Sequence, residues 1–377
     1  MKVFGYGTEA ADKDLVSVVF ERKDPRAGEI AFKVTYCGVC HSDLHQVRND
    51  WRNTTYPCVP GHEVVGEVTA VGDGVTRFAV GDVIGVGCMV NSCLDCEKCD
   101  AGVENYCQGP KGFTATYNGP AKARGENTYG GYTSHFVVRE EFAITVPNGY
   151  DPRYVGPVLC AGITVYSPMK HWGLEAGKTL GVVGVGGLGH MAIKLGKALG
   201  ARVVALTRSE GKTDEILKMG ADEVVISSDK EQMKSARQSL DLMINTIPVP
   251  HDINPYVGLM KSDSTIVIVG NLTNFENVVP GPLVFNRIGI AGSLIGGIKE
   301  TQEVLDLCAE HDITPSIKMV KMQDINDVLS TLEEGNDGDF RHVIDMQSLH
   351  EATDHLERTA ATIPDPYRGD VVNRRAS

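Results

Sequence analysis

Three kinds of segment are missing from this sequence, and each absence argues against a class of protein. No run of about 18 apolar residues occurs, so no membrane-spanning helix is predicted. Residues 1–7 contain no long apolar region, which argues against a cleaved signal peptide. No long basic block is present and the formal net charge is −13, which argues against nucleic acid or an anionic membrane as a partner. We therefore expect a cytoplasmic protein whose partner is a small molecule.

Cysteine is almost missing from the second half of the chain. Nine of the ten cysteines lie between Cys37 and Cys160, and only Cys308 follows. A secreted disulfide-bonded protein is usually smaller than 377 residues and carries a signal sequence. In a chain of this length, clustered cysteines more often bind metal. The length, with 42% hydrophobic residues, suits two domains with ordinary cores.

One group of cysteines has the spacing of a metal site. Cys93, Cys96, Cys99 and Cys107 are separated by two, two and seven residues. Four thiolates at this spacing can surround one tetrahedral zinc ion and leave no open position, which is the arrangement of a structural site. The alternative is a pair of disulfides, and the absence of an export signal argues against it.

A second metal site is suggested by residues that lie far apart in the sequence. Cys40, His62 and Cys160 would supply two thiolates and one imidazole, and three protein ligands leave the open position that a catalytic zinc requires. Spacing alone does not establish this set of ligands, because each of the three residues, taken separately, is more often a structural side chain than a metal ligand. Cys37 and Cys40 also fit a redox pair, although the polar residues that follow them favour a polar site instead.

Residues 179–212 organise the second half of the chain. Gly184, Gly186 and Gly189 fit the pattern G-x-G-x-x-G, between an apolar run typical of a buried strand and a segment of helical periodicity. Such glycines let the backbone approach a pyrophosphate, and the helix N-terminus favours its negative charge. The alternative is a glycine-rich turn in another kind of α/β domain. Strands and helices alternate beyond this point, which predicts a parallel, doubly wound sheet.

The residues after the second expected strand predict which nicotinamide cofactor binds. An NAD enzyme of this fold usually places Asp or Glu there, on the ribose 2′-hydroxyl. Here Thr207 occupies that position, and Arg208, Ser209 and Lys212 could give a 2′-phosphate charge-assisted hydrogen bonds. We therefore predict NADP(H). The alternative is that the basic side chains are solvated surface charges, and Glu210 weakens the prediction slightly.

Taken together, these motifs resemble those of one family. The sequence is similar to the zinc-dependent medium-chain alcohol dehydrogenases, and within them to the cinnamyl alcohol dehydrogenase group. The resemblance is carried by Cys-Gly-Val-Cys-His-Ser-Asp-Leu-His at 37–45, Pro-Gly-His-Glu at 60–63, the four-cysteine cluster, Cys-Ala-Gly-Ile-Thr-Val-Tyr-Ser-Pro at 160–168 and Gly-Val-Gly-Gly-Leu-Gly-His at 184–190. It fades near Ser348, and we expect the polar tail, residues 349–377, to be an exposed or subunit-hugging extension.

The resemblance implies a fold and an assembly. A Rossmann dinucleotide-binding domain, residues 157–294, would be inserted into a mainly-β GroES-like catalytic domain, residues 1–156 and 295–377, which carries the structural zinc. The resemblance also implies a homodimer, built through the sheet edge near Ile288–Ser293. Without a partner, an exposed apolar strand edge at this place would risk aggregation.

The resemblance further implies reversible, zinc-dependent, NADP(H)-linked reduction of aromatic or allylic aldehydes to primary alcohols. Cys40, His62 and Cys160 would hold the catalytic zinc, which polarises the aldehyde oxygen or lowers the pKa of the bound alcohol. Ser42 would pass the alcohol proton to His45.

Three more residues near this site are open to two interpretations each. Asp50 would assist the relay, or it is a solvated loop carboxylate. His41 would lie near the cofactor phosphates, or it makes a structural hydrogen bond in a loop. Glu63 would approach the metal when water is absent, or it orients neighbouring groups. The candidate set for the dinucleotide is Thr164, Gly184, Val185, Gly186, Gly187, Leu188, Gly189, Thr207, Arg208, Ser209, Lys212, Gly270 and Ser293.

Two other functions fit parts of the sequence. A polyol, short-chain or broad-specificity alcohol dehydrogenase of the same superfamily would share the two zinc sites, although the motif at residues 40–45 favours the aromatic and allylic group. A non-catalytic zinc-binding protein that keeps the fold would be expected to lack an open-site ligand or the relay hydroxyl, and all of these residues are present.

Overall fold

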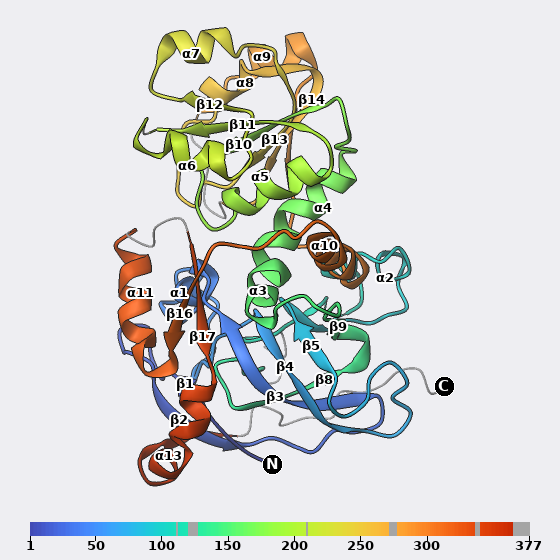
Figure 1. Cartoon of the computed structure of the whole chain (residues 1–377), viewed down its shortest axis with the longest axis vertical. Coiled ribbons are helices and arrows are strands. Elements are labelled where there is room, and N and C mark those ends of the chain that lie inside the picture. The colour runs from blue at the N-terminus through green and yellow to red at the C-terminus, as the bar shows by residue number, and fades with distance from the viewer. Residues whose placement is uncertain (111, 120–126, 209, 271–276, 336–339, 365–377) are drawn as a thin grey trace. The chain divides into compact units, whose positions relative to one another are not determined.

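The structure is a computed structural model, and it describes residues 1–110, 112–119, 127–208, 210–270, 277–335 and 340–364 (Figure 1). The chain folds into two compact units. The described residues of the first unit lie within 1–160, 317–335 and 341–364, and most of those of the second lie within 161–316. None of the helices in the described part of the chain is both long and apolar enough to cross a membrane.

The second unit is built on a six-stranded parallel sheet with the order β12-β11-β10-β13-β14-β15. Numbered from β10, this is the order 3-2-1-4-5-6 of a doubly wound Rossmann sheet, so the predicted fold class is confirmed. The strands are β10 (Thr179–Val183), β11 (Arg202–Thr207), β12 (Glu223–Ile226), β13 (Leu240–Asn245), β14 (Met260–Ile268) and β15 (Gly289–Gly292). The helices are α4 (Ile163–His171), α5 (Gly189–Ala198), α6 (Thr213–Lys218), α7 (Lys230–Ser235), α8 (Asn254–Val257), α9 (Pro280–Asn286) and α10 (Ile298–Glu310).

The local sequence explains why the glycine loop begins where it does. Leu180, Val182 and Val183 are buried in β10, as expected for a central strand covered on both faces. The crossover helix α5 contacts both β10 and β11, and its apolar residues Met191 and Leu195 are fully buried. The loop between β10 and α5 therefore opens at the carboxyl end of the sheet, where nucleotides bind in this architecture.

The first unit is mainly β. Its largest sheet has the order β16-β17-β3-β4-β5-β9, with β8 also paired to β3, and two small sheets have the orders β1-β2-β18 and β6-β7. The strands are β1 (Lys2–Gly7), β2 (Val16–Glu21), β3 (Glu29–Gly38), β4 (Val64–Val71), β5 (Val83–Val86), β6 (Met89–Asn91), β7 (Thr114–Ala115), β8 (His135–Arg139), β9 (Ile144–Thr145), β16 (Ile317–Lys321), β17 (Arg341–Asp345) and β18 (Ala361–Thr362). The helices are α1 (His41–Val47), α2 (Glu97–Asp100), α3 (Pro152–Pro157), α11 (Ile325–Glu333), α12 (Gln347–Glu351) and α13 (Thr353–Thr359).

Strand β3 brings distant parts of this unit together. It pairs with β4 through most of its length, with β8 at residues 29–33, and with β17 at residues 36–38. The pairing with β17 places Ile344 opposite Cys37 and Val343 opposite Gly38. The carboxyl end of β3 thus receives a strand from near the end of the chain, at the point where the first metal-site motif begins.

The limits of the two compact units differ from the predicted domain limits at two places. Residues 295–316, which are predicted to belong to the catalytic domain, group with the second unit, where α10 contacts α4. Cys160, which is predicted to belong to the nucleotide domain, groups with the first unit. A helix amphipathic enough to pack on either unit gives no sequence signal of which one it joins.

Of the two alternatives predicted for the tail, an exposed extension is wrong for residues 349–364, which pack against the first unit. Helix α13 contacts β2, and β18 extends the small sheet as a parallel neighbour of β2. The tail carries three buried apolar side chains, Leu349, Leu356 and Ile363, spaced seven residues apart. Burial of these three side chains packs the tail against the first unit, although the composition of the tail is otherwise polar. Residues 365–377 lie outside the described residues.

Candidate metal centres and dinucleotide site

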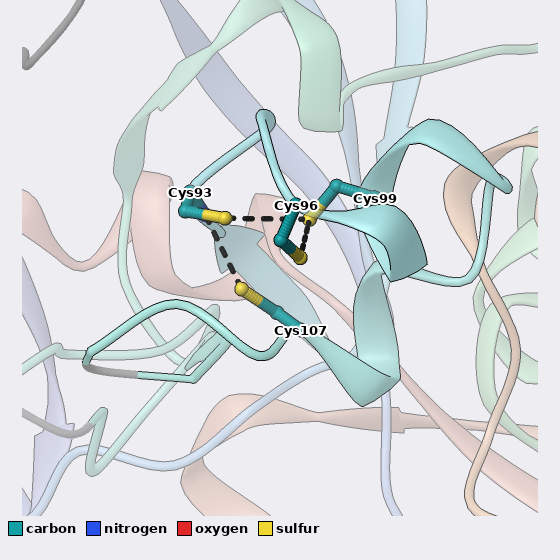
Figure 2. A group of neighbouring side chains, drawn as sticks. All are labelled: Cys93, Cys96, Cys99 and Cys107. Carbon is teal, nitrogen blue, oxygen red and sulfur yellow. Dashed lines mark hydrogen bonds between the residues drawn. The ribbon is translucent and has the colours of Figure 1, made fainter.

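The four predicted structural ligands converge in the first unit (Figure 2). Cys93 follows β6, Cys96 and Cys99 lie at the start of α2 and within it, and Cys107 follows a short 3-10 helix. The four sulfur atoms all lie within 4.8 Å of one another; Sγ of Cys99 is 3.8 Å from that of Cys93 and 3.5 Å from that of Cys96. These separations exceed the 2.05 Å of a disulfide bond, and all ten cysteines are free thiols.

Backbone amides point at these sulfur atoms. The N–H of Gln108 donates to Cys96 Sγ over 3.4 Å, and the N–H groups of Cys93 and Gly109 donate to Cys107 Sγ over 3.5 and 3.4 Å. The backbone N–H groups of Cys99 and Gln108 lower the pKa of the Cys96 thiol to about 6. Burial raises the pKa values of the Cys93, Cys99 and Cys107 thiols, so the fit to a closed site of four thiolates around zinc rests on the four converging sulfur atoms and on the N–H groups that point at them.

A second cluster of candidate ligands is fully buried in the same unit. Cys40 precedes α1, His62 precedes β4, and Cys160 lies in the turn of π-helix after α3. Nε2 of His62 is 3.2 Å from Cys160 Sγ, and the two sulfur atoms are 3.9 Å apart. A carboxylate oxygen of Glu63 joins them, with all four ligand atoms within 4.8 Å of one another. The structure therefore brings together every residue predicted for this site.

Asp43 organises this cluster, and the sequence analysis missed its role. Its carboxylate is completely buried and accepts hydrogen bonds from the backbone N–H of Cys40 and of Gly61, both over 2.9 Å. The same carboxylate lies 3.1 Å from Nδ1 of His62 and so directs the other ring nitrogen toward Cys160. The available signal was its place three residues after Cys40, where an acidic side chain caps the start of a helix.

Electrostatics in the cluster favour a cation. Burial alone would lower the pKa of His62, but the Asp43 carboxylate raises it well above its usual value. The hydrogen bond with Cys160, together with the charges of Arg341 and His62, holds the pKa of the Cys40 thiol well below its usual range. The same field that favours a proton on the imidazole favours a metal ion there. The hydrogen bonds with Cys40 and Cys88, together with burial, raise the pKa of the Cys160 thiol. The fit to zinc therefore rests on the donor set itself: two sulfur atoms, one imidazole and a nearby carboxylate.

Glu63 has a partner that sequence reasoning also missed. Its Oε1 forms an ion pair with Nη2 of Arg341, at the start of β17, and both side chains are buried. Its Oε2 lacks a hydrogen-bond partner among the described residues. Burial raises the pKa of Glu63 to about 7, against the lowering effect of Arg341. The available sequence signal was an arginine at the start of a strand that also carries the apolar residues Val343 and Ile344.

In the second unit, the three glycines of the loop each have a distinct physical reason. Gly184 has φ of +84°, a conformation that favours glycine, and a Cβ on Gly189 would meet the carbonyl oxygen of Gly184. A Cβ on Gly186 would meet no described atom within 4 Å, so this glycine faces open space in front of the loop. Close approach of a pyrophosphate at that point matches the dinucleotide fingerprint, and the residues present fit the cofactor.

Comparisons with known proteins agree with this geometry. Residues 26–148 match the family model of the alcohol dehydrogenase GroES-like domain, and residues 187–310 match that of the zinc-binding dehydrogenases. The chain is 45% identical over 351 residues to aldehyde reductase YahK of Escherichia coli, covering 93% of this chain and 99% of that protein. Curated relatives of similar identity include probable mannitol dehydrogenases.

Two solved structures resemble it over similar lengths. A cinnamyl alcohol dehydrogenase of Sorghum bicolor, SbCAD4, has a TM-score of 0.87 at 41% identity, covering 92% of this chain and 98% of that one. CAD from Helicobacter pylori, complexed with NADP(H), has a TM-score of 0.83 at 35% identity, covering 92% and 99%. The chain is a member of the zinc-dependent alcohol dehydrogenase family. The predicted resemblance is confirmed, and zinc and a nicotinamide dinucleotide are the cofactors of this dehydrogenase.

The candidate relay residues of the dehydrogenase lie on α1 and just after it. Ser42 and His45 are three residues apart on this helix and therefore share a face. Nδ1 of His45 lies 2.8 Å from the Asp50 carboxylate, and the Asp50 side chain is half exposed, so the two side chains are paired at the surface. The centroid of the His45 ring lies 6.3 Å from that of the His41 ring and 5.6 Å from that of the Trp51 ring.

Most of the candidate dinucleotide residues lie at the carboxyl ends of strands in the second unit. Thr207 ends β11, Arg208 follows and is exposed, and Lys212 precedes α6. Ser209 lies outside the described residues. Val185, Gly187 and Leu188 lie in the glycine loop, Thr164 is buried in α4, and Gly270 and Ser293 follow β14 and β15.

Thr246, which the sequence analysis did not single out, supports the glycine loop. Its hydroxyl donates to the carbonyl oxygens of Val183 and Gly184, over 3.0 and 2.9 Å. Thr246 directly follows strand β13, so these hydrogen bonds fasten the first glycine of the loop to the end of the neighbouring strand.

Proposed function

We propose that this dehydrogenase transfers hydride reversibly between NADP(H) and a primary alcohol or aldehyde, with a preference for aromatic and allylic substrates. The observation that carries the proposal is the buried set of Cys40, His62 and Cys160. Three donor atoms lie close together, with the imidazole oriented by Asp43. Three protein ligands leave one position for a substrate oxygen.

The metal and the protein would have separate tasks. Zinc, when bound, polarises the aldehyde oxygen or lowers the pKa of the alcohol. The chain holds the ligands: Asp43 keeps the His62 ring in one orientation through Nδ1, and burial keeps bulk water from the thiolates of Cys40 and Cys160. The cofactor carries the hydride, and the glycine loop with Gly186 at its open side binds the pyrophosphate.

Ser42, His45 and Asp50 would move the alcohol proton. A serine hydroxyl both accepts and donates, so Ser42 can take the proton and hand it on. His45 is partly exposed and paired with Asp50, which supports the imidazolium that forms and leaves a route to solvent. His41, next in the same helix turn, is proposed to lie beside the cofactor phosphates.

The preference for NADP(H) rests on the end of β11. Thr207 stands where a carboxylate would bind the ribose hydroxyl of NAD, and Arg208 and Lys212 supply positive charge beyond it. A charge-assisted hydrogen bond is worth roughly 1.5–3 kcal/mol, or about a tenfold to hundredfold preference. The double variant Thr207→Asp/Arg208→Ala should reverse the ratio of kcat/KM for NADPH to that for NADH. An unchanged ratio, or a parent that favours NADH, would show that these residues do not bind the 2′-phosphate.

The substrate preference is tested with a panel of compounds. Higher kcat/KM with cinnamaldehyde and benzaldehyde than with acetaldehyde or with oxidation of sorbitol and mannitol would support an apolar pocket beside the zinc. The second candidate is a polyol dehydrogenase, which the names of the mannitol dehydrogenase relatives favour. Comparable efficiency on mannitol and on cinnamaldehyde would favour that candidate.

A homodimer is proposed through the edge of the Rossmann sheet. Strand β15 is an edge strand, and the adjacent helix α9 presents Val284 and Phe285 with 76% and 89% of their surface exposed. An isologous pairing of two β15 strands would satisfy both edges and cover apolar surface. Light scattering at micromolar concentration should give the mass of two chains, and Ile290→Lys should halve it. A parent that is monomeric would refute the proposal.

A further inference from the structure

Gly38, at the end of β3, lies directly against the Glu63 side chain. A Cβ added to Gly38 would lie 2.8 Å from Cδ and 2.9 Å from Cβ of Glu63, and nearer still to Oε2. The nearest described atoms that such a Cβ would meet all belong to this one side chain. Gly38 does not have a positive φ, so the backbone does not require glycine here. Glycine is required at residue 38 because any side chain there would overlap the Glu63 carboxylate.

Arg341 holds the other side of the same carboxylate. Its Nη2 pairs with Oε1 of Glu63, and the pairing of β17 with β3 sets Val343 opposite Gly38, which brings Arg341 to this end of the sheet. The Glu63 carboxylate thus occupies a buried position with a guanidinium on one side and a glycine on the other. We call it the Gly38–Arg341 position.

The Glu63 carboxylate also lies close enough to the cluster of Cys40, His62 and Cys160 to become a metal ligand. One of its oxygens lies within 4.8 Å of the donor atoms of Cys40, His62 and Cys160, and Oε2 is buried without a hydrogen-bond partner among the described residues. A metal ion in the cluster would offer that oxygen a strong bond. If the carboxylate took the fourth metal position, a substrate oxygen would be excluded from it.

We infer that Gly38 is a positioning residue whose missing side chain leaves room for the Glu63 carboxylate beside Arg341, and so keeps the fourth zinc position free for substrate. The inference rests on the proposed function for the meaning of that position. Its test, however, reads metal coordination and does not depend on turnover.

The test variant is Gly38→Ala, studied as the full-length protein with cobalt in the catalytic site and zinc in the four-cysteine site. A methyl group at residue 38 should displace the carboxylate toward the metal, where its oxygen would replace water as the fourth ligand and shift the visible d–d absorption of cobalt. Release of the metal to a chromogenic chelator should slow by about tenfold, a change of the size that neighbours of metal ligands produce. Unchanged absorption and unchanged release in folded protein would overturn the inference.

A double variant separates displacement of the carboxylate from damage to packing. Gly38→Ala/Glu63→Gln keeps the crowding but replaces the carboxylate by a neutral amide, which is a much poorer zinc ligand. The altered cobalt spectrum should therefore revert, whereas persistence of the change would refute a role for the carboxylate. Gly181→Ala is the matched control, because its Cβ would also crowd a single side chain, 2.6 Å from Cδ1 of Leu240, in a buried strand without metal. It should alter stability and leave the cobalt spectrum unchanged.

Arg341→Gln tests the same position from its other side, and it decides the question if Gly38→Ala does not fold. Loss of the guanidinium should free Glu63 and give the same spectral shift as Gly38→Ala, again abolished by Glu63→Gln. A folded Arg341→Gln protein with the parent spectrum would overturn the inference. Failure of the parent to reduce any aldehyde would instead contradict the proposed function and leave these spectra interpretable.

Discussion

The two metal clusters of the first unit are built in opposite ways. The four cysteines lie within residues 93–107, are mostly half-buried, and receive hydrogen bonds from backbone N–H groups of the same loop. Cys40, His62 and Cys160 are 120 residues apart at their extremes, are fully buried, and are oriented by the side chains of other segments. A closed site can be made by one loop, whereas a site with an open position needs its ligands held by the surrounding fold.

The surrounding groups differ for the same reason. In the four-cysteine loop, the chain that supplies the sulfur atoms also supplies their donors, so no outside residue is needed. In the open cluster, Asp43 orients His62, and Arg341 holds Glu63 from a position 278 residues further along the chain. Removing a ligand from the first should therefore affect folding, and removing one from the second should affect chemistry.

The largest effect is expected for Cys40→Ser in the open cluster. Loss of a thiolate ligand should lower kcat/KM by at least about a hundredfold to a thousandfold, the range for losing a main electrostatic stabiliser of the transition state. The melting temperature should change little, because the fold around the cluster is held by the sheet. Elemental analysis should fall from two zinc ions per chain to one. A variant that keeps two zinc ions, or one that unfolds, would contradict the assignment of Cys40 to a catalytic site on which the fold does not depend.

Cys99→Ser in the four-cysteine loop should have the next largest effect, on stability. Zinc binding energy in such loops is folding energy, about 10–16 kcal/mol in isolated zinc-folded peptides. We expect less here, because the rest of the unit has a buried core of its own. Limited proteolysis should cut within residues 93–107, and the melting temperature should fall by several degrees. Protein that is still folded should keep the catalytic zinc. Loss of activity without any loss of stability would contradict the assignment of the two sites.

Asp43→Asn should weaken the open cluster alone. The amide keeps the shape but not the charge that orients and favours His62 as a ligand, so zinc affinity at this site should fall by about 10–100-fold. Competition with a chelator measures it, and zinc in the four-cysteine loop serves as the internal reference. Tyr132→Phe is the control, since its hydroxyl reaches the same carboxylate over a longer 3.4 Å. Equal losses at both sites would indicate a general packing defect.

The smallest effect is expected at His135, which lies outside both metal clusters. It is a loss of stability in acid that does not depend on metal. Burial, with His350 nearby, lowers the pKa of His135 to about 4, below the 6.5 of an unfolded histidine. The unfolded chain therefore binds more protons between pH 6.5 and 4, and stability is lost as the pH falls through that range. Allowing for the partial exposure of His135, the loss should be about 1–2 kcal/mol. His135→Gln should flatten this part of the curve from urea unfolding; an identical curve would assign the acid loss to other groups.

Most of the second unit could be predicted from sequence because its signals are local. The apolar run of β10 and the three glycines that follow are contiguous, and each glycine serves a need of its own loop. The cluster at residues 93–107 was predictable for the same reason, since short spacings limit where four sulfur atoms can lie. The limits of the two units could not be predicted in this way, because the unit to which α10 belongs depends on which surface the helix packs against.

The local features of this dehydrogenase follow from short stretches of its sequence: a glycine loop, a four-cysteine loop, and a helix that carries Ser42 and His45 on one face. The meeting of Cys40, His62 and Cys160, the orientation of the histidine by Asp43, and the enclosure of Glu63 by Gly38 and Arg341 depend instead on how distant segments pack. For Arg341 and Glu63, this packing follows from strand register. Pairing of β17 with β3, with Ile344 opposite Cys37, is what carries Arg341 to Glu63. A register is chosen by the burial of a whole sheet face, and the residues of a single motif do not specify it.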